Sequence, residues 1–151
     1  MIFVTVGSIV PFDDLIREVD GLAERGIMKD VVAQIGNGTY IPRNVEWFRF
    51  KKELTDYYRS SEVVITHGGA GTLFEVLKEG KKAIALPNPN VVHNPDIVMK
   101  LSNEGYILLC PDLKQLEESI LQARSWRPKE FKEPPCRIHE EIAKYLLGPS
   151  K

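Results

Sequence analysis

A glycine loop between two apolar runs is the segment of this sequence best suited to chemistry. The segment Val63–Pro87 reads VVITHGGAGTLFEVLKEGKKAIALP, in which a β-branched run ends at His67 and a helical pattern follows the glycines. Gly68, Gly69 and Gly71 allow the backbone to come close to an anion, and the free N–H groups at the start of the following helix attract one. The spacing therefore predicts a phosphate-binding turn at a helix N-terminus.

A hydroxyl and a carboxylate follow the glycines on the same predicted helix. Thr72 lies in its first turn, and Glu75 lies one turn later. Because helical side chains lean toward the N-terminus, the Glu75 carboxylate is expected over the mouth of the site. A carboxylate there suits a neutral diol, such as a ribose, better than a phosphate. These residues indicate a nucleotide or nucleotide-sugar site, although Lys78 and Glu79 are equally compatible with a helix face that only contacts water.

Three better-known glycine motifs do not fit this loop. Phe74 stands where a dinucleotide-binding GxGxxG motif needs its third glycine, and no Gly-Lys-Ser/Thr follows as in a P-loop. No serine lies between the glycines, as a nucleophile elbow requires. The structural alternative is a tight strand-to-helix turn that binds no ligand.

Other polar residues give weaker indications. Gly7 and Ser8 follow the first apolar run, where they form either a second anion-binding turn or only a chain reversal. His67, His93 and His139 are scattered, so no metal site is expected. At the end of its strand, His67 is expected to face a ligand or to be hydrogen-bonded.

The composition is that of a soluble globular protein. Of 151 residues, 43% are hydrophobic and 27% are charged, with 20 Lys and Arg against 21 Asp and Glu. This balance gives no reason to expect nucleic-acid binding. The opening MIFVTVGS is too short for a signal sequence, and no apolar run reaches the roughly 20 residues of a membrane span. Cys110 is expected as a buried free thiol, which favours a reducing, cytoplasmic compartment.

Apolar runs alternate with amphipathic ones along most of the chain. The strand candidates are Ile2–Val6, Val31–Ile35, Val45–Phe50, Val63–Thr66, Ala83–Leu86 and Tyr106–Cys110. Apolar residues at helical spacing follow most of these strands. Asn94 and Pro95 suit the N-cap and the first residue of one such helix. The pattern predicts an α/β fold, a single Rossmann-like, doubly wound domain whose mostly parallel six-stranded sheet carries helices on both faces.

The topology also predicts where the functional loops meet. Ligands of such sheets bind beyond the carboxyl ends of the strands. The loops expected there are Gly7–Pro11, His67–Thr72 and Pro87–Asp96.

The end of the chain is expected to differ from the rest. Within a single domain of residues 1–151, residues 127–151 form a Pro-containing connector and an amphipathic helix, Ile138–Leu147. That helix either docks a partner or merely covers the edge of the sheet.

Four motifs resemble those of a known family. The sequence contains TVGSIVPFDDLI at Thr5–Ile16, QIGNGTYIP at Gln34–Pro42, THGGAGTLFEVLKEGKKAIALPN at Thr66–Asn88 and EGYILLC at Glu104–Cys110. These segments resemble the donor-binding C-terminal domain of GT-B glycosyltransferases. They are most similar to the stand-alone catalytic subunits of lipid-linked UDP-N-acetylglucosamine transferases and to their prokaryotic exopolysaccharide relatives. The resemblance covers about residues 1–124 and implies half of a GT-B fold.

The resemblance implies a role for each residue of the loop. The Gly68–Thr72 loop would cradle the donor pyrophosphate, and Glu75 would hold the ribose hydroxyls. Gly7 and Ser8 would lie against the donor phosphate or sugar, and His67 would line the pocket near the phosphates. The implied donor-binding residues are Gly7, Ser8, His67, Gly68, Gly69, Ala70, Gly71, Thr72, Glu75 and Asn94. Ser8 and His67 are the candidate catalytic residues among them.

One loop departs from the family pattern. The family reads Asp/Asn-Asn-His-Gln where this chain reads His93-Asn94-Pro95-Asp96. Asn94 would approach the donor sugar. Pro95 removes a side-chain donor and a backbone N–H, and Asp96 places a negative charge where sugar or phosphate contacts are expected. The resemblance therefore leaves the identity of the sugar open.

The activity implied by the resemblance is sugar transfer from a UDP-sugar to a lipid-linked acceptor. The sugar would be N-acetylglucosamine or a related one, such as glucuronate. No metal or other cofactor is implied, because helix N–H groups stabilise the departing diphosphate. The reaction needs a general base, which two-domain relatives carry on their other domain. A membrane-anchored partner is therefore expected to hold the acceptor, to complete the active site and to recruit this chain to the cytoplasmic face of a membrane.

Two other classes of function stay open. A non-catalytic nucleotide-sugar-binding or regulatory module would bind the donor and never transfer the sugar. An NAD-type oxidoreductase is disfavoured by Phe74, and by Gly36 and Asn37, which stand where an acidic residue would end the second strand.

Overall fold

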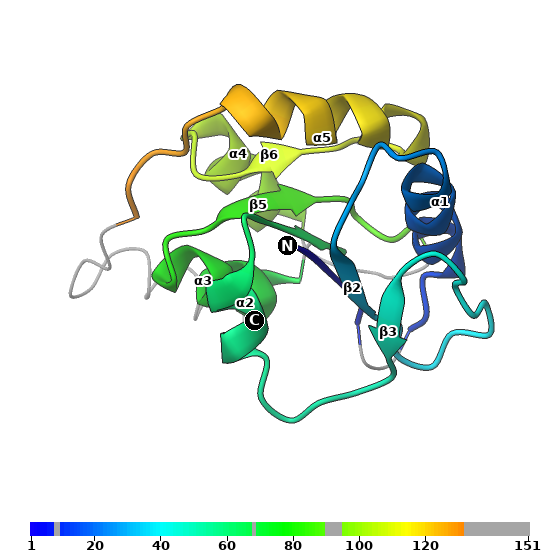
Figure 1. The fold of residues 1–151 in the computed structure, drawn as a ribbon. Helices are drawn as coiled ribbons and strands as arrows, with labels where there is room; N and C mark the ends of the chain where they lie inside the picture. The colour runs from blue at the N-terminus through cyan, green and yellow to red at the C-terminus, as the bar shows by residue number, and fades with distance from the viewer. Residues whose placement is uncertain (8–9, 68, 90–94, 132–151) are drawn as a thin grey trace.

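The computed structural model describes residues 1–7, 10–67, 69–89 and 95–131 (Figure 1). Its strands are β1 (Ile2–Thr5), β2 (Val31–Gln34), β3 (Glu46–Phe48), β4 (Val63–Thr66), β5 (Lys82–Ala85) and β6 (Leu108–Leu109). Its helices are α1 (Asp13–Glu24), α2 (Thr55–Ser60), α3 (Ala70–Lys78), α4 (Pro95–Asn103), the 3₁₀ turn η1 (Leu113–Gln115) and α5 (Leu116–Ser125). The order of these elements follows the alternation that the sequence predicts.

All six strands belong to one parallel sheet in the order β3-β2-β1-β4-β5-β6. Ile2 of β1 lies opposite Val31 of β2 on one side and opposite Val63 of β4 on the other. β1 and β4 are the central strands: β2 and β3 continue the sheet on the side of β1, and β5 and β6 continue it on the side of β4. Such a reversal of strand order opens a crevice at the carboxyl ends of β1 and β4.

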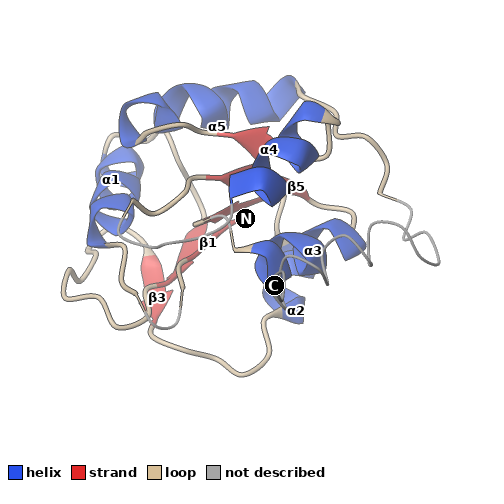
Figure 2. Cartoon of the chain, turned by 180° about the vertical axis from the view of Figure 1, so that it is seen from behind, coloured by secondary structure: helices blue, strands red, loops and turns tan. Residues whose placement is uncertain are grey.

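Helices cover both faces of the sheet (Figure 2). On one face, Leu15 of α1 and Ile120 of α5 pack in a core with Val4 of β1. On the other face, residues of α2, α3 and α4 pack with Phe3 of β1, and Leu73 is one of them. Phe3 and Val4 belong to opposite cores because successive side chains of a strand point to opposite faces. The predicted doubly wound fold is confirmed.

Two strands are shorter than the sequence predicts. β3 covers three residues rather than residues 45–50, and β6 covers two rather than residues 106–110. Both lie at an edge of the sheet, where only one neighbouring strand supplies hydrogen bonds. Phe48 packs against Tyr57 with ring centroids 5.1 Å apart, whereas 40% of Trp47 is exposed.

The helix boundaries are close to those predicted. Pro95 is the first residue of α4, as expected, although its proposed N-cap Asn94 lies outside the described residues. The helix expected after β6 begins as the 3₁₀ turn η1. Its N-cap residue is Asp112, whose carboxylate accepts a hydrogen bond of 3.2 Å from the Gln115 N–H. The predicted helix Ile138–Leu147 also lies outside the described residues. Among the described helices, none is long and apolar enough to cross a membrane.

Candidate functional site

Loops from distant parts of the sequence meet at the carboxyl end of the sheet. A Cβ atom built on Gly7, after β1, would lie 3.3 Å from Nε2 of His67, after β4. The Asn88 side-chain amide, after β5, donates a hydrogen bond of 3.1 Å to the carbonyl of Pro11. These contacts confirm that the loops after β1, β4 and β5 lie together, as the topology predicts.

The loop after β2 also reaches this cluster, and the sequence analysis missed it. Gly36 has a φ of +64°, and a Cβ atom there would lie 2.9 Å from the Gly7 carbonyl oxygen. Arg49, which follows β3, donates hydrogen bonds of 2.9 and 2.8 Å to the carbonyls of Gly36 and Gly38. The two glycines of the GNG segment could have indicated this contact from the sequence, because closely packed backbones and positive φ angles both favour glycine.

His67 lies between two glycines. Nε2 of its imidazole would be 3.3 Å from a Cβ atom on Gly7 and 2.8 Å from one on Gly69. Its Nδ1 is 3.3 Å from the hydroxyl of Thr66. A methyl group on Gly69 would therefore displace the ring, which is a physical reason for glycine at this position. The ring is hydrogen-bonded and at the loop cluster, in agreement with the prediction for His67.

The N-terminus of α3 opens at the same place. Gly69 is its N-cap residue and has no side chain with which to cap the first N–H groups. The first turn of α3 contains no acidic residue, whereas those of α1, α2, α4 and α5 do. A Cβ atom on Gly71 would meet nothing within 4 Å. The positive end of the α3 dipole is thus left without a carboxylate of its own first turn, which suits an anionic ligand.

Thr72 and Glu75 are brought together by a third residue, Tyr58 of α2. The Tyr58 hydroxyl donates a hydrogen bond of 3.4 Å to Oε1 of Glu75, and it is also hydrogen-bonded to the Thr72 side chain. Glu75 is exposed, whereas Tyr58 is 1% exposed. The Glu75 carboxylate therefore lies near the side chain of Thr72, which belongs to the first turn of α3.

Tyr58 is the functional candidate that the sequence reasoning did not identify. The sequence predicts only that it covers the sheet, and its ring does pack against Phe3 with centroids 5.9 Å apart. Burial, followed by the charge of Glu75, raises the pKa of Tyr58 well above its usual value. The phenol is therefore a hydrogen-bond donor at every physiological pH. Nothing in the sequence reveals this contact, because α2 and α3 meet only after folding.

Three of the predicted donor-binding residues, Ser8, Gly68 and Asn94, lie outside the described residues. The others lie at or beside the loop cluster. They are Gly7, His67, Gly69, Ala70, Gly71, Thr72 and Glu75. Within the described ranges, no group of three or more His, Cys, Asp or Glu side chains is placed to hold a metal ion.

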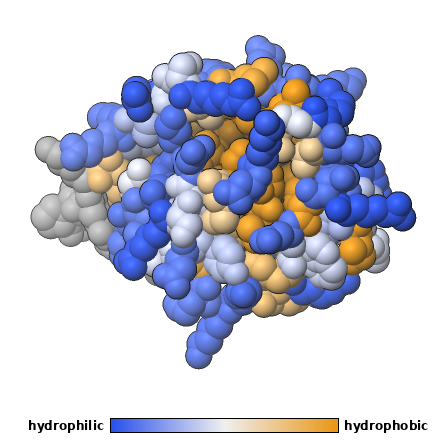
Figure 3. Space-filling view, in the orientation of Figure 1, coloured by the Kyte–Doolittle hydropathy of each residue, from blue (hydrophilic) through white to orange (hydrophobic). Residues whose placement is uncertain are grey.

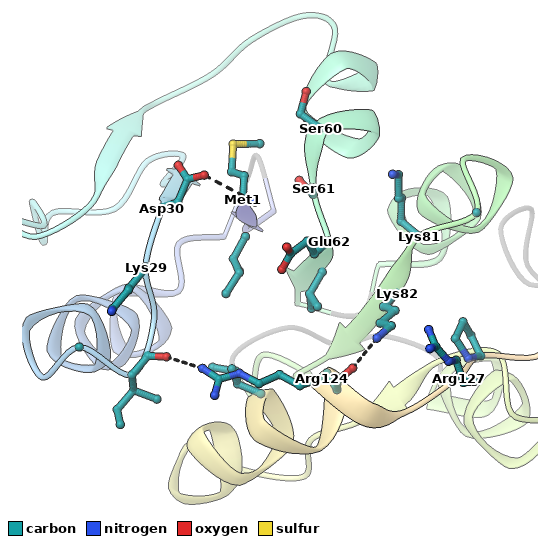
Figure 4. Close-up of a pocket in the computed structure, with 18 residues that line it drawn as sticks. Met1, Lys29, Asp30, Ser60, Ser61, Glu62, Lys81, Lys82, Arg124 and Arg127 are labelled. Atoms are coloured by element: carbon teal, nitrogen blue, oxygen red, sulfur yellow. Dashed lines mark hydrogen bonds and ion pairs between the residues drawn. The ribbon is translucent and has the colours of Figure 1, made fainter.

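A hollow of about 1120 Å³ lies at the other, amino end of the strands (Figure 4). Its basic lining residues are Lys29, Lys81, Lys82, Arg124 and Arg127, and its acidic ones are Asp30 and Glu62. Figure 3 shows apolar surface in the middle of this face with charged side chains around it. Two of the cations are bound to the main chain, since Lys82 donates to the Ala123 carbonyl at 2.6 Å and Arg124 to that of Ile27 at 3.1 Å. An anion thus has a second candidate location on this molecule, remote from the glycine loop.

Known proteins with similar sequences are glycosyltransferases. The human UDP-N-acetylglucosamine transferase subunit ALG13 is 31% identical over 123 residues, which are 72% of this chain and 11% of that protein. An uncharacterized glycosyltransferase of Methanosarcina acetivorans is 31% identical over 110 residues, which are 73% of this chain and 28% of that protein. The chain thus spans only about a tenth to a quarter of the length of these relatives.

Solved structures confirm the fold class. An NMR structure of ALG13 matches with a TM-score of 0.58 and 20% identity, covering 97% of this chain and 94% of that one. The spinosyn rhamnosyltransferase SpnG, complexed with spinosyn aglycone, matches with a TM-score of 0.64 and 20% identity, covering 82% of this chain and 36% of that one. The expected half of a GT-B fold is therefore the fold that this chain has.

The match to a sequence family is wider than the two sequence likenesses above. It covers residues 1–146 and is to the glycosyltransferase family 28 C-terminal domain. Because that match runs through nearly the whole chain, the protein belongs to the glycosyltransferase family 28 C-terminal domain family.

Proposed function

We propose that this chain is the donor-binding subunit of a glycosyltransferase that uses a UDP-sugar. The observation that carries the proposal is the mouth of α3. There, a helix N-terminus whose N-cap residue, Gly69, has no side chain lies beside the hydroxyl of Thr72 and the carboxylate of Glu75. The Gly68–Thr72 loop, Ala70 included, would bind the diphosphate through backbone N–H groups. Glu75 would accept hydrogen bonds from the ribose hydroxyls.

The other proposed donor contacts surround this mouth. Gly7 and Ser8 would lie against the donor phosphate or sugar, and His67 beside the phosphates. Asn94 would approach the sugar. The sugar in this proposal is N-acetylglucosamine or a related one, such as glucuronate. Pro95 and Asp96 occupy positions at which the family carries a histidine and a glutamine, so the contacts to the sugar would differ there from those of the family.

The proposed reaction is a displacement at the anomeric carbon of the donor. The acceptor hydroxyl oxygen forms a bond to that carbon, the bond from the carbon to the diphosphate oxygen breaks, and the hydroxyl proton passes to a general base. Negative charge then grows on the departing UDP. The N–H groups and dipole of α3 would stabilise this charge, so the proposed transfer needs no metal ion.

The acceptor and the base belong to a partner in this proposal. A membrane-anchored subunit would hold a lipid-linked sugar acceptor, supply the base and recruit this chain to the cytoplasmic face of a membrane. The human relative is a transferase subunit, which supports a heteromeric enzyme. The chain would then be inactive until the partner is added.

Calorimetric titration with UDP, ADP and NAD tests the proposal. We expect the wild-type chain to prefer UDP, and Glu75→Ala to weaken UDP binding by about 10- to 100-fold, because a charged hydrogen bond contributes about 1.5–3 kcal/mol. Glu79→Ala is the matched control: Glu79 is the C-cap residue of the same helix, but it pairs with Arg59 at 2.8 Å. It should change UDP affinity less than twofold.

Each other result has a definite meaning. Preference for ADP or NAD would contradict the proposal, and so would equal losses in the two glutamate variants. UDP binding without sugar transfer, after candidate membrane partners and acceptors have been added, would favour a non-catalytic binding module.

A further inference from the structure

Two polar contacts join the short helix α2 to α3. Tyr58 of α2 contacts Glu75 of α3. The next residue, Arg59, forms an ion pair of 2.8 Å with Glu79, the C-cap residue of α3 one turn further along the chain. The two glutamates lie on the same side of α3, since they are four residues apart. Helix α2 thus faces the side of α3 that carries Glu75.

Tyr58 is held much more firmly than the carboxylate that it contacts. Its ring is buried among the residues packed on Phe3, and its centroid lies 5.9 Å from the Phe3 ring at an angle of 66°. Glu75 is an exposed side chain, and fixing a side chain of this length costs up to about 2 kcal/mol of entropy. A rigid donor that holds Oε1 lowers this cost when a ligand binds, because the carboxylate is already oriented.

The second oxygen of the carboxylate, Oε2, would then contact the ligand. An ionised carboxylate accepts hydrogen bonds at both oxygens. The contact from Tyr58 is to Oε1, and the Thr72 side chain is hydrogen-bonded to the same phenol. This single buried phenol therefore contacts both the residue proposed for the ribose and a residue proposed for the diphosphate.

We propose that Tyr58 is a positioning residue for nucleoside recognition: its hydroxyl orients the Glu75 carboxylate toward the ribose 2′- and 3′-hydroxyls. The inference rests on the proposed binding of UDP at the mouth of α3. Through Tyr58, helix α2 would contribute to the preference for a ribonucleotide over a deoxyribonucleotide.

The test compares the binding of UDP with that of 2′-deoxy-UDP by calorimetry. The wild type should bind UDP more tightly. Tyr58→Phe keeps the ring and removes only the hydroxyl, and we expect it to weaken UDP binding by about 3- to 10-fold while changing 2′-deoxy-UDP binding less. The ratio of the two affinities should therefore shrink. If Tyr58 had a purely structural role, Tyr58→Phe would weaken the binding of both ligands equally and leave the ratio of their affinities unchanged.

Tyr57→Phe is the matched control in the same helix. The Tyr57 ring stacks on Phe3 with centroids 5.0 Å apart, so this variant removes a hydroxyl from the same aromatic cluster. It should leave the ratio as in the wild type. If Tyr57→Phe lowers the ratio as much as Tyr58→Phe does, the inference is wrong.

A second measurement keeps the native hydroxyl. With 3-fluorotyrosine at position 58, the ¹⁹F resonance should shift further on saturation with UDP than with 2′-deoxy-UDP. Equal shifts, or an unchanged affinity ratio in Tyr58→Phe, would overturn the role of Tyr58. A wild type that binds UDP and 2′-deoxy-UDP equally well would instead contradict the ribose contact of Glu75, and a wild type that binds neither would contradict the proposed function itself.

Discussion

At the scale of single residues, the His67 imidazole fits between Gly7 and Gly69 because neither residue has a side chain. The backbone of Gly69, with φ −65° and ψ 131°, is accessible to alanine, so the expected conflict of Gly69→Ala is with His67 Nε2, 2.8 Å from the added methyl. We expect this variant to move the imidazole resonances in NMR spectra and to weaken UDP binding. Its free energy of unfolding should change by less than about 1 kcal/mol, because the ring can rotate away.

Gly71→Ala is the control at the same scale. A methyl group on Gly71 meets nothing within 4 Å, and alanine favours the helix over glycine by about 1 kcal/mol. This variant should leave the imidazole resonances in place and raise the free energy of unfolding. Unmoved resonances in Gly69→Ala would show that His67 does not lie between the two glycines.

At the scale of elements, helix α1 holds the loop after β2 with a buried carboxylate. Asp20 is 3% exposed and accepts hydrogen bonds from the Tyr40 hydroxyl at 2.6 Å and from the Asn44 N–H at 2.7 Å. Burial opposes ionisation, but these hydrogen bonds and one from the Arg43 N–H outweigh it and lower the pKa of Asp20. Asp20 therefore stabilises the fold above its unfolded pKa of about 4, and this contribution disappears as the pH falls through the lower, folded value.

Asp20→Asn should consequently change the response of stability to acid. We expect it to lower the free energy of unfolding at pH 7 by about 1.5–3 kcal/mol, measured by urea denaturation. Below about pH 4 the difference from the wild type should become smaller, because the wild type loses the same charge. Asp14→Asn, which changes an exposed carboxylate of the same helix, should have little effect at either pH. A difference from the wild type that does not vary with pH would show that the charge of Asp20 is unimportant.

At the scale of the whole molecule, the two ends of the sheet are alternative candidate locations for an anion. The glycine loop lies at the carboxyl ends of the strands and the basic hollow at the amino ends, separated by strands of about four residues, or roughly 13 Å. This exceeds the Debye length of about 8 Å at physiological ionic strength. We expect the triple variant Lys29→Gln, Lys81→Gln and Arg127→Gln to change UDP affinity less than twofold.

The triple variant locates the nucleotide when it is compared with Glu75→Ala. A tenfold loss of UDP binding in the triple variant would place the nucleotide in the basic hollow and contradict the site proposed at α3. The comparison is direct because these three residues line the hollow and none belongs to the loop cluster. Lys82 and Arg124 are left unchanged, since their bonds to main-chain carbonyls hold α5 in place.

Much of this architecture is predictable from local sequence. The unit from β4 to β5 has nearly the boundaries that its apolar runs and glycines indicate. β-Branched residues favour the strand, glycines precede the helix, and Gly80 at φ +72° follows its end, and each of these preferences depends only on residues nearby in the sequence. The edge strands β3 and β6 were predicted too long, since an edge strand ends where its single neighbouring strand stops supplying hydrogen bonds. The roles proposed for Ser8, Gly68 and Asn94 stay predictions.

The sequence by itself determined the parallel sheet, the position of the glycine loop at a helix N-terminus and the family, because these follow from periodicity and from motifs contained in short segments. Only the tertiary structure decided which residues meet: Tyr58 with Glu75, Gly36 with Gly7, and Asp20 with Tyr40. These pairs lie 17, 29 and 20 positions apart in the chain. Contacts at such separations have no local signature, because they exist only once strand order and helix packing have brought distant residues together.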